Sequence, residues 1–196
     1  AGAFLGDLGI TTSLNPNENC PEEQQDCCDA PTGGTPELED DDLHKTILYV
    51  TNLAVPARRN FKDAQVLNGK KLFHEINCSG CHTPKFTTGT HPRFKNLSKQ
   101  TIWPYTDLLV HDMGEKLADN RPGYEANGNE WRTPPLWGIG LIKTVNNHTY
   151  LMHDGRARSI EEAILWHGGE AEKSKNEYMK LTKKERLAIL AFLNSL

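Results

Sequence analysis

No run of apolar residues in this 196-residue sequence approaches the roughly 20 that a membrane-spanning helix requires. We therefore expect no membrane span. An excess of basic charge is lacking too, because 22 Lys and Arg stand against 26 Asp and Glu and give a formal net charge of −4. This balance argues against nucleic acid as a partner, since no basic surface is available to neutralise a phosphate backbone.

Apolar residues are few as well, and make up only 37% of the chain. Such a low share is typical of a loop-rich fold, or of a core that is completed by a group other than amino acids. The four Trp, five Tyr and six Phe nevertheless offer enough large side chains for a packed core. The chain is therefore a poor match to an intrinsically disordered sequence.

The sequence also lacks the apolar–polar alternation of β-strands and any internal repeat. Helical patterns are present instead, and the last two begin with capping-box sequences, S-x-x-E and T-x-x-E. We expect helices at 42–54 and 62–75, one opening at Ser159 and one opening at Thr182. The apolar stripe of the second helix is formed by Val66, Leu67, Leu72 and Phe73. The prediction is an all-α fold with long irregular loops and little or no β-structure.

We expect a single domain over 1–196, made of a loop-rich N-terminal extension at 1–42 and a core at 43–196. Pro, Gly, Asn and acidic residues dominate the extension. Its acidic end, 37–42, is typical of a helix N-terminus, where carboxylates interact favourably with the helix dipole. The alternative for this run is a docking surface for a basic partner.

Five cysteines are present, so at least one of them does something other than pair within the chain. Cys20, Cys27 and Cys28 lie together in the N-terminal extension. A disulfide from Cys20 to either Cys27 or Cys28 would stabilise this loop, because it restricts the unfolded chain. Vicinal cysteines rarely bond to each other, so one of the three is expected to remain unpaired.

The other two cysteines belong to a C-x-x-C-H motif, Cys78-Ser-Gly-Cys81-His82, that follows the helix at 62–75. Two thiols at this spacing can add to the two vinyl groups of a haem, and the adjacent His82 can then bind the iron. A thioredoxin-like site would require a βαβ setting, and a zinc site a second pair of ligands; neither is evident. We therefore predict one covalent haem c in a cytochrome c-like domain.

The sixth iron ligand decides the function, because a strong ligand favours electron transfer whereas a weak or absent one lets peroxide bind. Methionine and histidine are the side chains that can fill this position. The candidates are Met113, Met152, Met179, His111, His148, His153 and His167.

Several segments together resemble the di-haem oxidoreductase family, which is related to bacterial di-haem cytochrome c peroxidases and to MauG-type proteins. WRTPPLWGIG and LMHDGRARSIEEAILWHGGEA, within 131–171, resemble the C-terminal part of that family. The resemblance extends over most of the chain, through the segments GDLGIT, LAVPARR, TPKFTTG, PYTDLLVHDMG and FLNSL.

The resemblance implies that the sixth ligand comes from the end of the helix that follows the H-D-G turn, where this sequence has His167. Met113 is the alternative. Gly168 and Gly169 would end that helix and let the backbone approach the porphyrin. In the same turn, Arg156 and Arg158 would bind haem propionates, or would form surface ion pairs instead.

Family members carry two C-x-x-C-H motifs and this chain has one, so the resemblance implies a C-terminal haem domain that relays electrons. The partner would be a second haem domain or a separate redox protein. A peroxidase-like haem oxidoreductase with a labile distal ligand is the alternative. Covalent haem attachment and a disulfide predict a periplasmic or otherwise exported protein. Nothing in the sequence indicates an oligomeric state.

Overall fold

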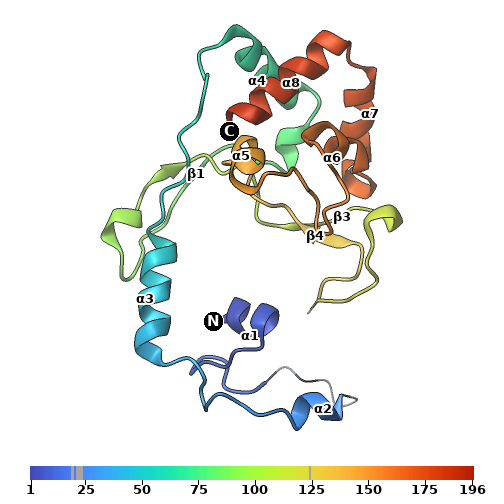
Figure 1. The fold of residues 1–196 in the computed structure, drawn as a ribbon. Helices are drawn as coiled ribbons and strands as arrows, with labels where there is room; N and C mark the ends of the chain where they lie inside the picture. Colours follow the sequence, from blue (N-terminus) through green and yellow to red (C-terminus); the bar gives the residue numbers. More distant parts are fainter. Residues whose placement is uncertain (19, 21–23, 124) are drawn as a thin grey trace. The chain divides into compact units, whose positions relative to one another are not determined.

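The structure, a computed structural model, describes residues 1–18, 20, 24–123 and 125–196 (Figure 1). The chain divides into two compact units, Ala1–Ala54 and Val55–Leu196. The C-x-x-C-H motif and every predicted haem-site residue belong to the second unit. In the part of the chain that the structure describes, none of the helices has the length and apolar character needed to cross a bilayer.

The first unit contains the helices α1 (Gly2–Leu8), α2 (Gln25–Cys28) and α3 (Asp40–Thr51). Cys20 and Cys27 form a disulfide, which confirms one of the two predicted pairings; the side chain of Cys28 lies outside the described residues. The loop before α3 is held by Glu37, whose carboxylate accepts hydrogen bonds from the backbone N–H and the hydroxyl of Thr11.

The acidic run at the end of the extension forms the start of a helix. Asp40, Asp41 and Asp42 fill the first turn of α3, as the helix-dipole argument predicted. The helix begins two residues earlier than expected and ends at Thr51. It belongs to the first compact unit, although the sequence analysis grouped it with the core at 43–196.

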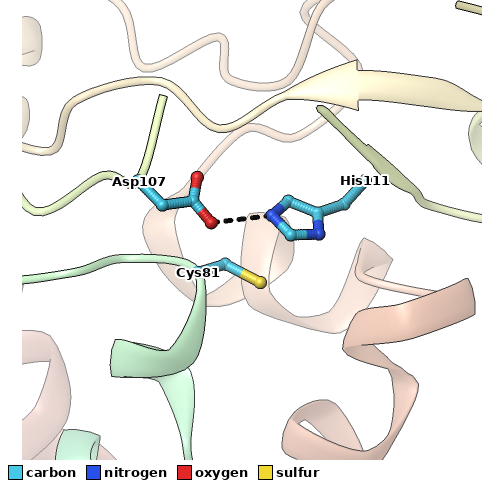
Figure 2. Close-up of side chains that lie close together, drawn as sticks. All are labelled: Cys81, Asp107 and His111. Carbon is cyan, nitrogen blue, oxygen red and sulfur yellow. Dashed lines mark hydrogen bonds and ion pairs between the residues drawn. The ribbon is translucent and has the colours of Figure 1, made fainter. Parts of the chain in front are cut away.

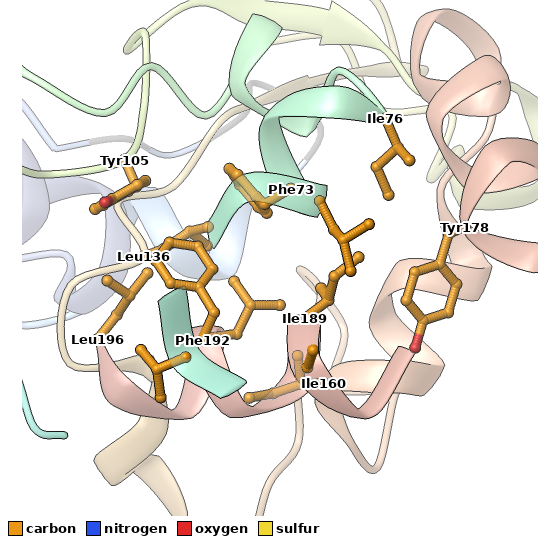
Figure 3. Packing of buried hydrophobic residues seen from close by; sticks show 13 residues of the cluster. Phe73, Ile76, Tyr105, Leu136, Ile160, Tyr178, Ile189, Phe192 and Leu196 are labelled. Atoms are coloured by element: carbon orange, nitrogen blue, oxygen red, sulfur yellow. The ribbon is translucent and has the colours of Figure 1, made fainter. Parts of the chain in front are cut away.

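The second unit is built on α4 (Ala64–Glu75) and α8 (Lys183–Ser195), which pack closely against each other. Val66, Leu72 and Phe73 of α4 are buried against α8, where Ile189 and Phe192 are also fully buried (Figure 3). Leu67 was expected in the same stripe but is 52% exposed, so this part of the prediction is wrong. At 3.6 residues per turn, position 67 lies on the opposite side of the helix from the middle of the face formed by Val66, Leu72 and Phe73, so it points away from α8.

Capping side chains explain where α4 and α8 each begin. Asp63 accepts hydrogen bonds from the backbone N–H groups of Gln65 and Val66 at the start of α4. Thr182 and Glu185 form the predicted capping box at the start of α8. At the third predicted cap, Ser159 accepts from the N–H of Glu162, whose carboxylate instead binds the backbone N–H of Arg158.

Removing the hydroxyl in Thr182→Ala should lower the free energy of unfolding by about 1 kcal/mol, because it leaves the N–H of Glu185 without its cap. Urea unfolding followed by circular dichroism measures this loss. The matched control is Thr144→Ala on an exposed face of α5 (Ile142–Asn146), which should change stability by no more than about 0.5 kcal/mol. Equal stability of the two variants would contradict the capping role.

The rest of the second unit consists of long loops with short elements. The shorter helices are α6 (Ile160–Trp166), α7 (Glu172–Lys180) and the 3-10 turns η1 (Cys78–Gly80), η2 (Lys95–Leu97), η3 (Glu115–Leu117), η4 (Ile139–Leu141) and η5 (Gly169–Ala171). The strands are β1 (Phe86–Thr87), β2 (Thr101–Ile102), β3 (Val110–Asp112) and β4 (Glu130–Arg132).

These strands form two antiparallel pairs, β1 with β2 and β3 with β4. The prediction of a helical, loop-rich fold is therefore confirmed, but β-structure is present where the sequence analysis expected next to none. Strands of two or three residues are too short to show an alternating pattern, so periodicity could not reveal them.

Candidate functional site

His82 is placed by the turn that follows α4. Asn77 adopts the left-handed conformation, with φ of 63°, and the chain then winds through η1 into His82. The Nδ1 atom of His82 lies 3.1 Å from the backbone carbonyl oxygen of Tyr105. A carbonyl only accepts, so Nδ1 carries the proton and Nε2 keeps a free lone pair. Burial lowers the pKa of His82 to about 4, which keeps the ring neutral.

His167 is placed in the same manner at the C-terminal end of α6. Its Nδ1 atom lies 2.7 Å from the carbonyl oxygen of Ala163, one turn earlier, so its Nε2 is also free. Burial again lowers the pKa of the ring. The ring centres of His167 and His82 are 6.4 Å apart, with their planes inclined by 52°. The structure thus brings together two neutral imidazoles that lie 85 positions apart in the sequence.

The two motif cysteines are free thiols at either end of η1. Burial raises the pKa of Cys78 to about 12, and it also raises the pKa of Cys81. Both side chains therefore remain protonated. Cys78 packs against the core between α4 and α8, which fixes one end of the motif.

Cys81 points toward the side chains of Asp107, in the loop leading into β3, and of His111, in β3 itself (Figure 2). The thiol, one carboxylate oxygen and one ring nitrogen lie within 4.8 Å of one another. His111 Nε2 is 2.8 Å from Asp107 Oδ2, and His111 Nδ1 is 2.9 Å from Glu170 Oε2. Glu170 and then Asp107 raise the pKa of His111 through these hydrogen bonds.

This trio could in principle hold a metal ion, but its chemistry disfavours one. A metal requires a thiolate and a neutral imidazole. Burial keeps Cys81 protonated, whereas two carboxylates favour the protonated form of His111. The ligand atoms of Asp107 and His111 are moreover already bound to each other. We therefore interpret the trio as a hydrogen-bonded cluster beside the motif.

The glycines after His167 lie against the end of β3. A Cβ atom on Gly168 would be 2.8 Å from the carbonyl oxygen of Met113, and one on Gly169 would be 2.2 Å from that of Asp112. These glycines end α6 as predicted. The group that leaves no room for a side chain here is the protein backbone, whereas the sequence analysis expected an approach to the porphyrin. Met113, the alternative ligand, meets this segment through its main chain, and its N–H donates to Asn129.

The two arginines of the H-D-G turn are both paired with carboxylates. Arg156 binds Asp154 at 2.6 Å, donates to the carbonyl oxygen of Lys116, and lies over the ring of Trp166 at 4.9 Å. Arg158 is 78% exposed and binds Glu162 at 3.1 Å.

A model of the family described as "Di-haem oxidoreductase, putative peroxidase" matches residues 1–196, the whole chain. The chain belongs to this di-haem oxidoreductase family. No curated protein and no solved structure matches it. Membership makes the chain a haem-binding oxidoreductase, as the sequence analysis predicted. This di-haem oxidoreductase sequence carries one C-x-x-C-H motif, at 78–82.

Sequence reasoning singled out His82 and His167, whose rings this di-haem oxidoreductase brings close together, but it did not single out Asp107 or Glu170. His111 was considered only as an axial ligand, whereas both of its ring nitrogens are bound to carboxylates. The spacing of Asp107 and His111 is that of many surface ion pairs and gives no specific signal. Glu170 lies 59 positions beyond His111, and only the tertiary fold brings them together.

Proposed function

We propose that this chain binds one covalent haem c between His82 and His167 and transfers one electron at a time. The observation that carries the proposal is the pair of neutral imidazoles with ring centres 6.4 Å apart. The family supports the cofactor in general terms. The covalent attachment, the ligand pair and the electron-transfer role go beyond family membership, and we propose them for this chain.

The spacing of the two rings fits a metal ion between them. A metal–nitrogen bond to imidazole is about 2 Å long, and the nitrogen lies about 1 Å from the ring centre. Two imidazoles on opposite faces of one metal ion therefore have ring centres about 6 Å apart. The separation of 6.4 Å between His82 and His167 agrees with this value.

The hydrogen bonds behind the rings support the same assignment. Histidines that bind metals usually donate the other ring N–H to a carbonyl or carboxylate, which fixes the tautomer and makes the ligand nitrogen more basic. His82 donates to Tyr105 and His167 to Ala163 in this way. Met113 is the alternative to His167, but no comparable arrangement supports it among the described contacts.

The protonated thiols of Cys78 and Cys81 suit covalent attachment. Each S–H would add across one vinyl group, so that sulfur bonds to one carbon, hydrogen goes to the other, and no external oxidant is needed. When bound, the haem supplies an iron that changes between ferrous and ferric states. The imidazoles of His82 and His167 would hold this iron, and two imidazoles keep its reduction potential lower than a methionine ligand would.

A one-electron carrier needs a donor and an acceptor, and we propose that a second haem domain or a separate redox protein fills this role. The single motif supports the view that the chain corresponds to the C-terminal haem domain of its two-haem relatives. We further propose an exported location, because covalent haem attachment and the Cys20–Cys27 disulfide both suit an oxidising compartment.

The haem content of the purified holoprotein tests the proposal. We expect intact mass to exceed the polypeptide by one haem, which stays attached after denaturation in acidic organic solvent. Cys78→Ser combined with Cys81→Ser should release the haem under the same treatment, whereas the matched Cys20→Ser variant should retain it. Haem that is extracted from the wild-type protein would contradict covalent attachment. Rapid reaction of the ferric protein with peroxide would favour the peroxidase-like alternative.

A further inference from the structure

His111 lies between two carboxylates, and none of these three side chains is a proposed iron ligand. Its Nε2 is 2.8 Å from Asp107, and its Nδ1 is 2.9 Å from Glu170. Carboxylates accept hydrogen bonds, so both ring nitrogens must donate, and this requires the imidazolium form. Both bonds are therefore charge-assisted, which makes them stronger than bonds between neutral groups.

Glu170 connects this ion pair to the segment that carries His167. It lies three residues after His167, and its second carboxylate oxygen accepts the backbone N–H of Asp112 at 2.9 Å. Gly169 lies so close to the carbonyl of Asp112 that no larger residue fits there. The loop after His167 is thus bound to β3 by side-chain and backbone contacts together.

Asp107 connects the same ion pair to the segment that carries His82. It follows Tyr105, whose carbonyl oxygen accepts from His82, and Thr106, whose N–H donates to Thr83 at 3.1 Å. The carboxylate of Asp107 also accepts the N–H of Leu109 at 2.9 Å, which fixes its orientation. The two proposed iron ligands are therefore connected by hydrogen bonds, from His82 to Tyr105 and from His111 to Asp107 and Glu170, together with the short chain segments 105–107 and 167–170.

We propose that His111 is a positioning residue whose ion pair with Glu170 holds His167 opposite His82 and so keeps the sixth iron position closed to small ligands. This inference rests on the proposed ligation by His82 and His167. Loss of the ion pair leaves the loop after His167 attached to β3 only by the hydrogen bond from the Asp112 N–H to residue 170 and by the close backbone approach at Gly169. The distal imidazole then leaves the iron more often, and a small anion can enter.

Glu170→Gln tests the ion pair with the least structural disturbance. The side chain is 55% exposed, and the amide keeps the shape of the carboxylate but not its charge. The probe is the rate at which cyanide binds to the ferric holoprotein, followed by its absorption spectrum. We expect a rise of about threefold, since water screens an exposed pair. The matched control is Glu177→Gln, which breaks an exposed pair with Lys180 in α7 and should leave the rate unchanged.

His111→Gln should have a larger effect, about tenfold, because it removes both charge-assisted bonds and leaves the largely buried carboxylate of Asp107 without its charged partner. In a protein that already carries His111→Gln, the further change Glu170→Gln should not raise the cyanide-binding rate again, because the ion pair is already broken. Thermal unfolding of each variant accompanies the measurement, and an unchanged midpoint in Glu170→Gln excludes global unfolding as the cause.

Wild-type cyanide rates in both Glu170→Gln and His111→Gln would overturn the positioning role, as would equal effects of Glu170→Gln and Glu177→Gln. A wild-type protein that is itself high-spin and binds cyanide at once would instead contradict the proposed ligand pair. The two failures are therefore distinguishable from the wild-type spectrum alone.

Discussion

His167→Ala should convert the ferric holoprotein from a low-spin to a high-spin form and open the iron to cyanide. The imidazole of His167 is held 6.4 Å from that of His82 by its bond to Ala163, and alanine leaves this position without a ligand. Loss of a strong axial ligand changes the spin state outright, so this effect exceeds that of any change around it. Absorption spectra of the ferric protein, with and without cyanide, measure it.

The matched control is His148→Ala, because His148 is exposed and its ring stacks on Tyr150 instead. It should keep the wild-type spectrum. His167→Met gives an independent check, since a thioether in the same position should keep the iron low-spin while raising its reduction potential. Unaltered low-spin bands in His167→Ala would show that another side chain, with Met113 the first candidate, is the sixth ligand.

Gly69→Ala should destabilise the second unit more than any other single-methyl change. A Cβ atom at this position would lie 1.8 Å from the carbonyl oxygen of Ala188 and 2.9 Å from Phe192, so α4 and α8 would have to separate. Overpacking of this severity costs about 3 kcal/mol. We expect the unfolding midpoint to fall by about 10 °C, measured by circular dichroism.

Gly89→Ala is the matched control, because a Cβ atom there meets nothing within 4 Å and its φ is not in the left-handed region. It should leave the midpoint unchanged or raise it slightly, since alanine restricts the unfolded chain. If Gly69→Ala unfolds at the wild-type temperature, the close approach of the two helices is wrong.

The two helices α4 and α8 could be predicted from the sequence, because each shows a clear local pattern. Val66, Leu72 and Phe73 lie at helical spacing, and Thr182 with Glu185 forms a recognisable cap, so α4 and α8 followed from local chemistry. Leu67 was misplaced because hydrophobicity alone does not say which side of a stripe meets the partner helix. The strand pairs were missed because register between β3 and β4 is set by contacts across 20 residues.

Of the candidate site, only the C-x-x-C-H motif was predictable from the local sequence. The spacing of Cys78, Cys81 and His82 expresses a chemical requirement that is visible in five consecutive residues. His167 required a family resemblance, since a single histidine in a helix has no specific signal of its own. Asp107 and Glu170 acquire their role from the fold, which brings both carboxylates to His111.

Electron paramagnetic resonance of the wild-type ferric holoprotein, combined with its near-infrared magnetic circular dichroism, tests the central claim most directly. One haem held between His82 and His167 predicts a low-spin signal with the near-infrared band of two imidazole ligands. A high-spin signal would contradict the closed sixth position. A low-spin signal with the band of histidine–methionine ligation would contradict the assignment of His167.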